Sequence, residues 1–472
     1  MSKKTSKKLY QETKKKLFQE RPLGWDRLRD KEEEVFEYAR GYRDFISQVK
    51  TERECADFIL TRAREAGFSL FEEATPKSER LIFTNRGKAL ALAVRGEGGP
   101  RGLKIIASHI DSPRLDLKPN PLYEEMDLAY LKTHYYGGIK KFQWLARPLA
   151  IHGVVIKGDG RRVDFVLGEE GPVFCINDLL PHLARKAQGE KKLSEAIAGE
   201  KLNVLFGGLP FPAEEGAAER VKLGVLKILS DRFGLVEEDF VSADIEIVPA
   251  GPARDVGLDG AFVGGYGQDD RICAFTSLTA LLEARRLPET VLLLFLDREE
   301  IGSDGNTGAK SRFLELVLSR LLRLWGERAL EADSVLELLF RTRAISADVT
   351  AGMDPDWPEV HEKRNDAKMG RGVAISKYTG HGGKYGASEA RAEYMGWLRQ
   401  VLNRAGVTWQ AVDFGKVDEG GGGTVAKYLA FQGLDIVDMG PPLLSMHSPF
   451  EICHKVDLFE THRAYRAFLE AE

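Results

Sequence analysis

The sequence predicts an α/β protein: a mixed, largely parallel sheet flanked by helices, with a β-rich domain inserted into it. Strand-like and helix-like apolar patterns alternate in the first and last parts of the chain. The middle part, residues 113–248, has short strand-like runs separated by glycines and charges. The 472 residues are enough for two or three domains. We therefore predict a discontinuous α/β domain, residues 1–112 and 249–472, interrupted by the insert.

The first part of the chain begins with a basic segment, residues 1–16, which has no apolar run after it. This pattern is typical of a solvated helical arm and not of a secretory signal. Apolar residues at helical spacing predict helices over residues 31–50 and 51–68. The run "GLKIIASHID", residues 102–111, predicts a strand with a polar end.

The insert contains the strand-like runs "PLAIHGVVIKG" and "RRVDFVLGEE". After it, helical patterns cover residues 269–287, 388–406 and a segment that follows the glycines of residues 420–423. Strands are predicted between these helices, because short apolar runs lie there: 290–297, 343–350, 372–378, 408–414 and 433–440. Ligands of such open sheets bind beyond the carboxyl ends of the strands.

Composition excludes several classes of protein. The net charge of −4 and the pI near 6.2 provide no general attraction to nucleic acid or to an anionic membrane. No apolar run approaches the roughly 18 residues of a membrane span. Neither nucleic acid nor a membrane is therefore expected as a partner. Cys55, Cys175, Cys273 and Cys453 lie far apart, which suggests neither a disulfide framework nor a thiolate zinc site. A cytoplasmic location is expected.

Polar residues gather where the predicted strands end. His109 and Asp111 are two residues apart, so their side chains share a face of the strand and the carboxylate could orient the imidazole. Asp269 and Asp270 begin a predicted helix, where they could equally be helix caps. Asp348 follows an apolar strand.

The run "VLLLFLDREE" places two adjacent glutamates, Glu299 and Glu300, at another strand end. Alternation along a strand is expected to send them in different directions, so that they serve different partners. His447 lies in a proline-rich loop after the last strand, where an ordinary loop histidine is the alternative. By counting, two histidines, two aspartates and two glutamates supply a two-metal site with an open position on each ion and one glutamate left as general base.

These stretches resemble those of the aspartyl aminopeptidase family, the zinc metallo-aminopeptidases of the vacuolar aminopeptidase I type. The similar segments are "SHIDSPRL", "YYGGIKKFQWLARPLAIHG", "DREEIGS", "SAD" followed by Pro355 and "HE", and "SMHSPFE", in family order over nearly the whole chain. The resemblance implies a zinc-peptidase type of sheet and hydrolysis of the N-terminal residue from peptides with a free N-terminus. It also implies two divalent metal ions, Zn²⁺ by preference, although Co²⁺ or Mn²⁺ suit the same ligands.

The resemblance assigns roles position by position. His109, Asp348 and bridging Asp269 would hold one metal ion, and Asp269, Glu300 and His447 the other. Glu299 would be the general base, and Asp111 would orient His109.

The resemblance further implies that the insert builds dimers that assemble into a homododecamer. His182 of the insert matches a histidine that reaches a neighbouring subunit's active site; an ordinary helix histidine is the alternative. Alternative functions are another dinuclear hydrolase on this sheet, such as a deacylase or a deblocking aminopeptidase, or a non-catalytic shell protein.

Departures from the family pattern concern substrate preference. Arg298 replaces a histidine, Asp354 stands where another is usual, and Ser376 falls where acid-selective members have a lysine, with Lys377 adjacent. A substrate carboxylate needs a cation in the pocket. The preferred N-terminal residue therefore stays open between acidic and neutral.

Overall fold

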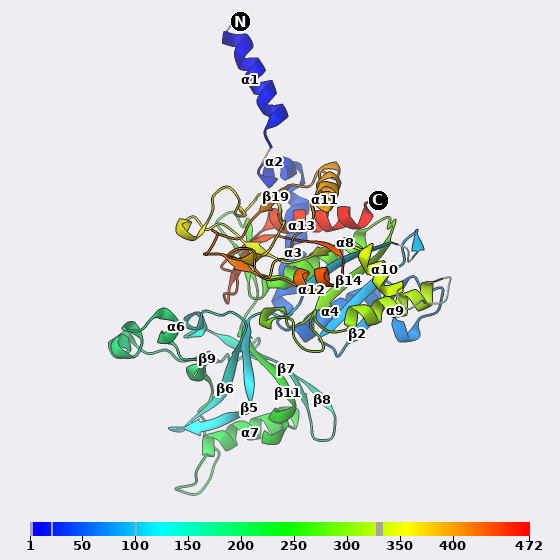
Figure 1. Ribbon diagram of the computed structural model, residues 1–472. Coiled ribbons are helices and arrows are strands. Elements are labelled where there is room, and N and C mark those ends of the chain that lie inside the picture. The colour runs from blue at the N-terminus through cyan, green and yellow to red at the C-terminus, as the bar shows by residue number, and fades with distance from the viewer. Residues whose placement is uncertain (1–2, 20–21, 100–101, 327–333) are drawn as a thin grey trace.

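The structure is a computed structural model that describes residues 3–19, 22–99, 102–326 and 334–472 (Figure 1). Its largest sheet has nine strands, and the four strands β14, β4, β15 and β21 run parallel at its centre. The order is β1 (Ser69–Leu70), β2 (Arg80–Asn85), β3 (Ala89–Val94), β14 (Thr290–Leu296), β4 (Leu103–His109), β15 (Arg343–Ser346), β21 (Asp435–Gly440), β17 (Val373–Ser376) and β19 (Trp409–Val412).

Helices cover both faces of this sheet. Alternate side chains of β14 explain why: Val291, Leu293 and Phe295 enter one apolar core, and the residues between them enter the other. The first core is closed by α3 (Glu32–Gln48), α4 (Glu52–Glu65), α8 (Gln268–Glu283), α11 (Ala392–Arg404) and α13 (Lys455–Glu470). The second is closed by α9 (Phe313–Trp325), α10 (Ser334–Phe340) and α12 (Ala426–Phe431). A mixed α/β architecture is thus confirmed.

A second sheet of seven strands, paired antiparallel throughout, lies below the first in Figure 1. Its order is β8 (Arg162–Leu167), β7 (Leu149–Ile156), β11 (Ala243–Pro249), β5 (Arg114–Glu125), β6 (Leu128–Tyr136), β10 (Val204–Gly207) and β9 (Cys175–Ile176). Helix α7 (Arg220–Phe233) packs Val221, Val225 and Leu229 into the core of this sheet. The short helices α5 (Pro181–Ala184) and α6 (Leu193–Ala196) lie in the loop between β9 and β10.

Two smaller sheets adjoin the first. One has five strands in the order β12 (Arg254–Val256), β13 (Phe262–Gly265), β23 (Glu451–His454), β22 (Pro442–Leu444) and β16 (Thr350–Ala351). The other pairs β18 (Gly380–His381) with β20 (Gly421–Gly422).

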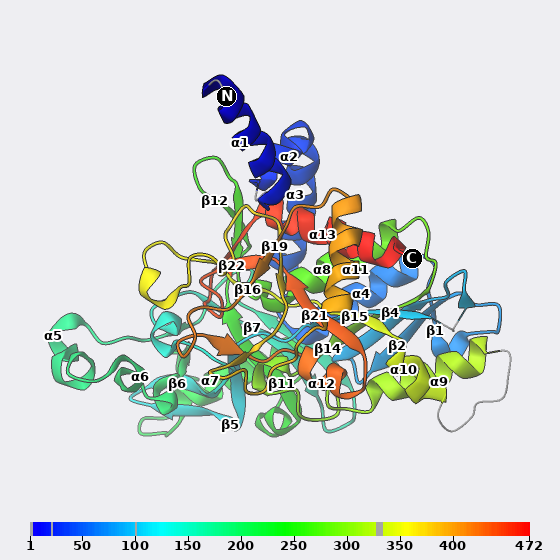
Figure 2. The same cartoon turned by 45° about the horizontal axis from the view of Figure 1, so that its top comes forward.

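The basic N-terminal segment is helical, as predicted, and forms α1 (Lys3–Leu17). It projects from the body of the molecule beside α2 (Gly24–Leu28) (Figures 1 and 2). None of the helices in the described ranges has the length and apolar character needed to cross a bilayer.

Candidate metal centre

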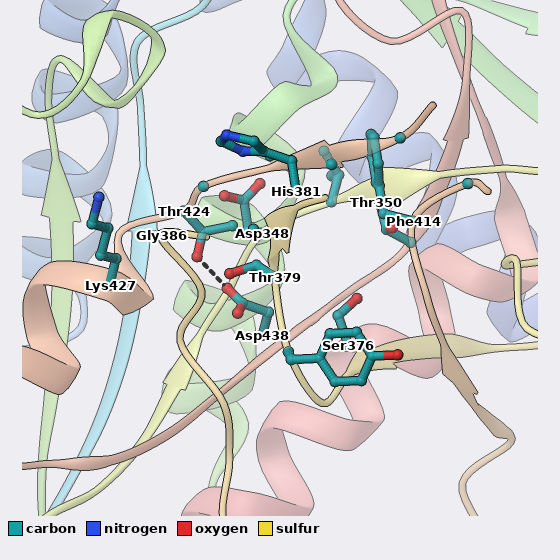
Figure 3. Close-up of a pocket in the computed structure, with 18 of the residues that line it drawn as sticks. Asp348, Thr350, Ser376, Thr379, His381, Gly386, Phe414, Thr424, Lys427 and Asp438 are labelled. Carbon is teal, nitrogen blue, oxygen red and sulfur yellow. Dashed lines mark hydrogen bonds between the residues drawn. The ribbon is translucent and has the colours of Figure 1, made fainter. Parts of the chain in front are cut away.

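The strand ends of the central sheet open into one cavity of about 720 Å³. Leu296 of β14 is paired with His109 of β4, so these two parallel strands end side by side. Figure 3 shows part of this lining, in which Asp348, His381, Phe414 and Lys427 are labelled. The structure brings six of the predicted site residues into this lining: His109, Asp269, Glu299, Glu300, Asp348 and His447.

Asp269 lies between the two histidines. Its Oδ1 is 3.2 Å from His109 Nε2, and its Oδ2 is 3.2 Å from His447 Nε2. Burial alone would raise the pKa of Asp269, but the hydrogen bonds to His109 and His447 outweigh it and lower this pKa below its ordinary value. A buried carboxylate with one histidine on each oxygen has the arrangement of a bridging metal ligand.

Three further carboxylates surround this group. Glu300 Oε2 lies 3.4 Å from His447 Nε2. On the other side, Asp348 Oδ1 and Glu299 Oε2 lie 4.0 Å and 3.9 Å from His109 Nε2. Glu300 also brings a ligand atom within 4.8 Å of those of His109 and Asp269, so the carboxylates surround both histidines.

The charge balance of the cavity fits bound cations. Burial, together with the neighbouring Asp269 carboxylate, raises the pKa of Glu300 well above its ordinary value, and burial and Asp270 do the same for Asp348. Glu300 Oε1 is buried and has no hydrogen-bond partner among the described residues. Burial opposes the protonation of His447, but Asp269 and Glu300 raise its pKa to about 10. Imidazole nitrogens and carboxylate oxygens are the donors that zinc prefers when thiolates are absent, so the residues fit the metal.

The two adjacent glutamates diverge for a reason other than the one predicted. Strand β14 ends at Leu296, and Glu299–Ile301 form one turn of 3₁₀ helix. This turn lies between Arg298 (φ +68°) and Gly302 (φ +93°), both in the left-handed region. The prediction that strand alternation separates Glu299 from Glu300 is therefore wrong: the strand has already ended, and a helical turn points the two side chains.

Asp111 is buried and lies behind His109. Its Oδ1 is 3.2 Å from His109 Nδ1 and accepts the backbone N–H of Glu299 at 3.1 Å. Its Oδ2 accepts the backbone N–H of Glu300 at 3.2 Å and the hydroxyl of Tyr136 at 2.8 Å. Burial alone would raise the pKa of Asp111, but the hydrogen bond from His109 leads the interactions that lower it. The charged carboxylate therefore connects one histidine with the turn that carries both glutamates.

Known proteins that resemble this chain show its family. The family model described as aminopeptidase I zinc metalloprotease (M18) matches residues 45–469. The chain belongs to the M18 family. A probable M18 family aminopeptidase 1 of Thermotoga maritima is 49% identical over 446 residues, which are 93% of this chain and 97% of that protein. The M18 chain is therefore a zinc metallo-aminopeptidase, a hydrolase.

Solved structures agree with this M18 assignment. A crystal structure of an M18 aminopeptidase from Thermotoga maritima has a TM-score of 0.91 and 48% identity, over 96% of this chain and all of that one. Aminopeptidase I of Clostridium acetobutylicum has a TM-score of 0.90 and 43% identity, over the same shares. The mApe1 dodecamer of S. cerevisiae, at 20% identity and a TM-score of 0.73 over 91% and 95% of the two chains, shares the fold alone.

Two buried carboxylates of this M18 centre escaped the sequence analysis as functional residues. Asp270 begins the predicted helix beside Asp269 and has no role in the predicted ligand set. It brings a ligand atom within 4.8 Å of those of His109 and Asp348, and neither of its oxygens has a hydrogen-bond partner in the described ranges. Glu451 accepts the backbone N–H groups of Asp269 at 3.2 Å and His447 at 2.8 Å. The glutamate of "SMHSPFE" was visible in the motif, but nothing local indicated that it accepts from the backbone of Asp269 and His447.

Of the remaining predicted residues of the M18 chain, His182 and Lys377 lie outside the cavity lining and Ser376 lies in it. His182 is exposed on α5 and does not line the cavity. Ser376 lines the cavity, whereas the adjacent Lys377 does not, and its ammonium lies 3.8 Å from Glu389. A one-residue shift therefore does not bring Lys377 into the cavity wall.

Proposed function

We propose that the centre holds two divalent metal ions, Zn²⁺ by preference, with Co²⁺ and Mn²⁺ as alternatives that suit the same donors. Asp269 would contribute a ligand to both ions, and each ion would take one histidine and one further carboxylate. The observation that carries this proposal is the position of His109 and His447 on opposite oxygens of Asp269. The ligand sets are His109, Asp348 and Asp269 for one ion and Asp269, Glu300 and His447 for the other.

The reaction is hydrolysis of the first peptide bond of a peptide with a free N-terminus. Bound metal ions supply positive charge that lowers the pKa of water and polarises the scissile carbonyl. Glu299 is the general base: its carboxylate accepts a proton from the attacking water and passes it to the leaving amine as the C–N bond breaks. Burial raises the pKa of Glu299 to about 7 in the metal-free protein; Asp111 and Asp269 add to this effect, and His109 and His447 oppose it.

The arrangement of the chain is part of the same proposal. Residues 1–112 and 249–472 form the catalytic domain, and residues 113–248 form an inserted domain that joins subunits into dimers and then a dodecamer. Exposed apolar side chains support an association surface: Met126 and Leu209 in loops of the inserted domain, and Leu223 and Ile228 on α7. In such an assembly His182 would serve a neighbouring subunit's cavity.

The test is substitution of Glu299 by glutamine, which keeps the shape of the side chain and removes the base. We expect two bound metal ions by elemental analysis, an unchanged oligomeric state, and a kcat lowered about 10²–10⁴-fold on an aminoacyl substrate. The matched control is Glu389→Gln, at an exposed glutamate outside the cavity lining. Wild-type activity in Glu299→Gln, or protein that binds no metal, would refute the mechanism.

A further inference from the structure

The second sheet reaches the candidate metal centre at the end of strand β6. The strand ends at Tyr136, whose hydroxyl donates to Asp111 Oδ2 at 2.8 Å. Two residues later, the backbone carbonyl of Gly138 accepts from His447 Nδ1 at 3.0 Å. We call residues 136–138 the β6 corner. The corner contacts Asp111, which lies behind His109, and it contacts His447 directly. The two histidines lie on opposite oxygens of Asp269.

The Tyr136 ring is held in place by buried charge. The Arg114 guanidinium lies 3.9 Å from the centre of this ring, and both residues are at least nine-tenths buried. Arg114 is fixed in turn by Glu246, 3.1 Å away on the second sheet, and Glu52, 3.7 Å away on α4. Since these contacts join the two parts of the molecule, the Tyr136 hydroxyl has little freedom to leave Asp111.

The two glycines allow the backbone to come this close. Gly137 has φ +72°, and a Cβ there would lie 3.3 Å from the Cβ of Glu300. A Cβ on Gly138 would lie 3.2 Å from His447 Nδ1. The corner therefore approaches Glu300 and His447 as closely as a backbone can, and a side chain at either position would push against a candidate ligand.

In both histidines, Nδ1 faces a backbone carbonyl oxygen. His109 Nδ1 faces the backbone carbonyl of Asp111 at 3.1 Å and its carboxylate, and His447 Nδ1 faces the carbonyl of Gly138. Because these partners only accept, each Nδ1 carries a hydrogen. Each Nε2 faces an oxygen of Asp269, so its lone pair becomes available for an ion once the proton between them is released. Groups that set the tautomer and orientation of a histidine ligand raise its affinity for the metal.

We propose that the β6 corner positions the two histidines for metal binding, Tyr136 through Asp111 on His109 and the Gly138 carbonyl directly on His447. The inference rests on the proposed two-metal centre. It gives the second sheet a part in building that centre, in addition to any part in association. Tyr136 is a positioning residue, since it contacts Asp111 and no residue of the proposed ligand set is bonded to its hydroxyl.

The test compares Tyr136→Phe with Tyr394→Phe, using metal-free protein prepared with a chelator. Tyr394 is the matched control because it is equally buried, and its hydroxyl donates to the carbonyl of Ala344 at 2.6 Å, away from the cavity lining. Zinc affinity is measured by competition with a chromophoric chelator, and ligand geometry by the visible spectrum of Co²⁺-loaded protein. For Tyr136→Phe we expect one ion bound about 10–100-fold more weakly and an altered Co²⁺ spectrum, with neither change in Tyr394→Phe.

A second variant, Gly138→Ala, crowds His447 and is expected to weaken the other ion. Wild-type zinc affinity and Co²⁺ spectrum in both Tyr136→Phe and Gly138→Ala would overturn the inference and leave the proposed function standing. A wild-type protein that binds no zinc or Co²⁺ would instead overturn the proposed function, and the inference with it. Because thermal stability is recorded for all three variants, a loss of metal affinity that follows only stability, and appears equally in Tyr394→Phe, also counts against the inference.

Discussion

Substitution of Asp111 by asparagine tests the hydrogen-bond network behind the metal centre. The carboxylate accepts three hydrogen bonds, from the Glu299 N–H on Oδ1 and from the Glu300 N–H and the Tyr136 hydroxyl on Oδ2. Its Oδ1 also lies 3.2 Å from His109 Nδ1. An asparagine has one oxygen and one NH₂ group. Its oxygen is expected at the Oδ1 position, because the Tyr136 hydroxyl can turn and accept from the NH₂. The Glu300 N–H then faces another donor and loses its partner.

The cost follows from this arrangement. One buried N–H without an acceptor costs about 1–3 kcal/mol, and each remaining bond loses about 1 kcal/mol when the acceptor is no longer charged. The amide avoids the burial of a charge, which offsets part of that sum. We therefore expect a loss of about 2–4 kcal/mol in the free energy of unfolding, which for a chain of this length lowers Tm by roughly 2–4 °C. Because His109 loses a charged partner, zinc affinity should fall about 10–100-fold.

The assay is urea denaturation of metal-free protein, combined with zinc competition titration. Asp457→Asn is the matched control: this buried carboxylate accepts the backbone N–H groups of Gly370 at 2.7 Å and Gly372 at 2.6 Å, and it does not line the cavity. Burial raises the pKa of Asp457 well above its ordinary value, so this variant should lose stability through the altered hydrogen bonds alone, with unchanged zinc affinity. If Asp111→Asn is as stable as wild type, or binds zinc no more weakly than Asp457→Asn, the reasoning is refuted.

Three further predictions concern single positions. In Gly440→Ala the new Cβ would lie 2.1 Å from the backbone oxygen of Asp348, so we expect a loss of at least about 1–3 kcal/mol by denaturation and weaker zinc binding; wild-type values for both would contradict the crowding. Gly396 lies inside α11 with open space around it, so Gly396→Ala should raise the free energy of unfolding by about 0.5–1 kcal/mol. A lower Tm in this variant would contradict the expectation. Burial lowers the pKa of His454 to about 4, while its Nδ1 accepts the N–H of Val456. The unfolded chain takes up this proton below about pH 6.5 and the folded one only below about pH 4, so stability is lost as pH falls through this window, by about 2 kcal/mol at pH 5. His454→Asn keeps a capping acceptor and should lose about 2 kcal/mol less than wild type between pH 7 and 5 in metal-free protein; equal losses would show that this ring does not titrate as described.

The strands were predictable because their cause is local. The run that became β14 is apolar from Val291 to Leu296, as expected for a short strand with both faces covered. The polar residues that follow such strands, His109 and Asp348 among them, could be selected because parallel strands bring their carboxyl ends to one edge of a sheet.

The turn that carries the two glutamates could not be predicted in the same way. Its course depends on Arg298 in a left-handed conformation, which a non-glycine residue adopts only when its surroundings hold it there. Here the surroundings include Asp111, which comes from another strand and binds the backbone of Glu299 and Glu300. The same limit applies to Glu451, whose partners Asp269 and His447 are backbone groups with no signature in the sequence.

The amino-acid sequence by itself determined the chemistry of this M18 aminopeptidase: which segments form strands and helices, and which side chains at the strand ends can bind a metal or accept a proton. These properties follow from residue type and from spacing over a few positions. The tertiary structure decided which of those side chains meet. His109 and His447 are far apart in the chain, and only packing brings them to the two oxygens of Asp269. The tertiary structure also places Tyr136 and Gly138 of the second sheet within hydrogen-bond distance of Asp111 and His447. A hydrogen bond depends on where two atoms lie in space and not on how many residues separate them.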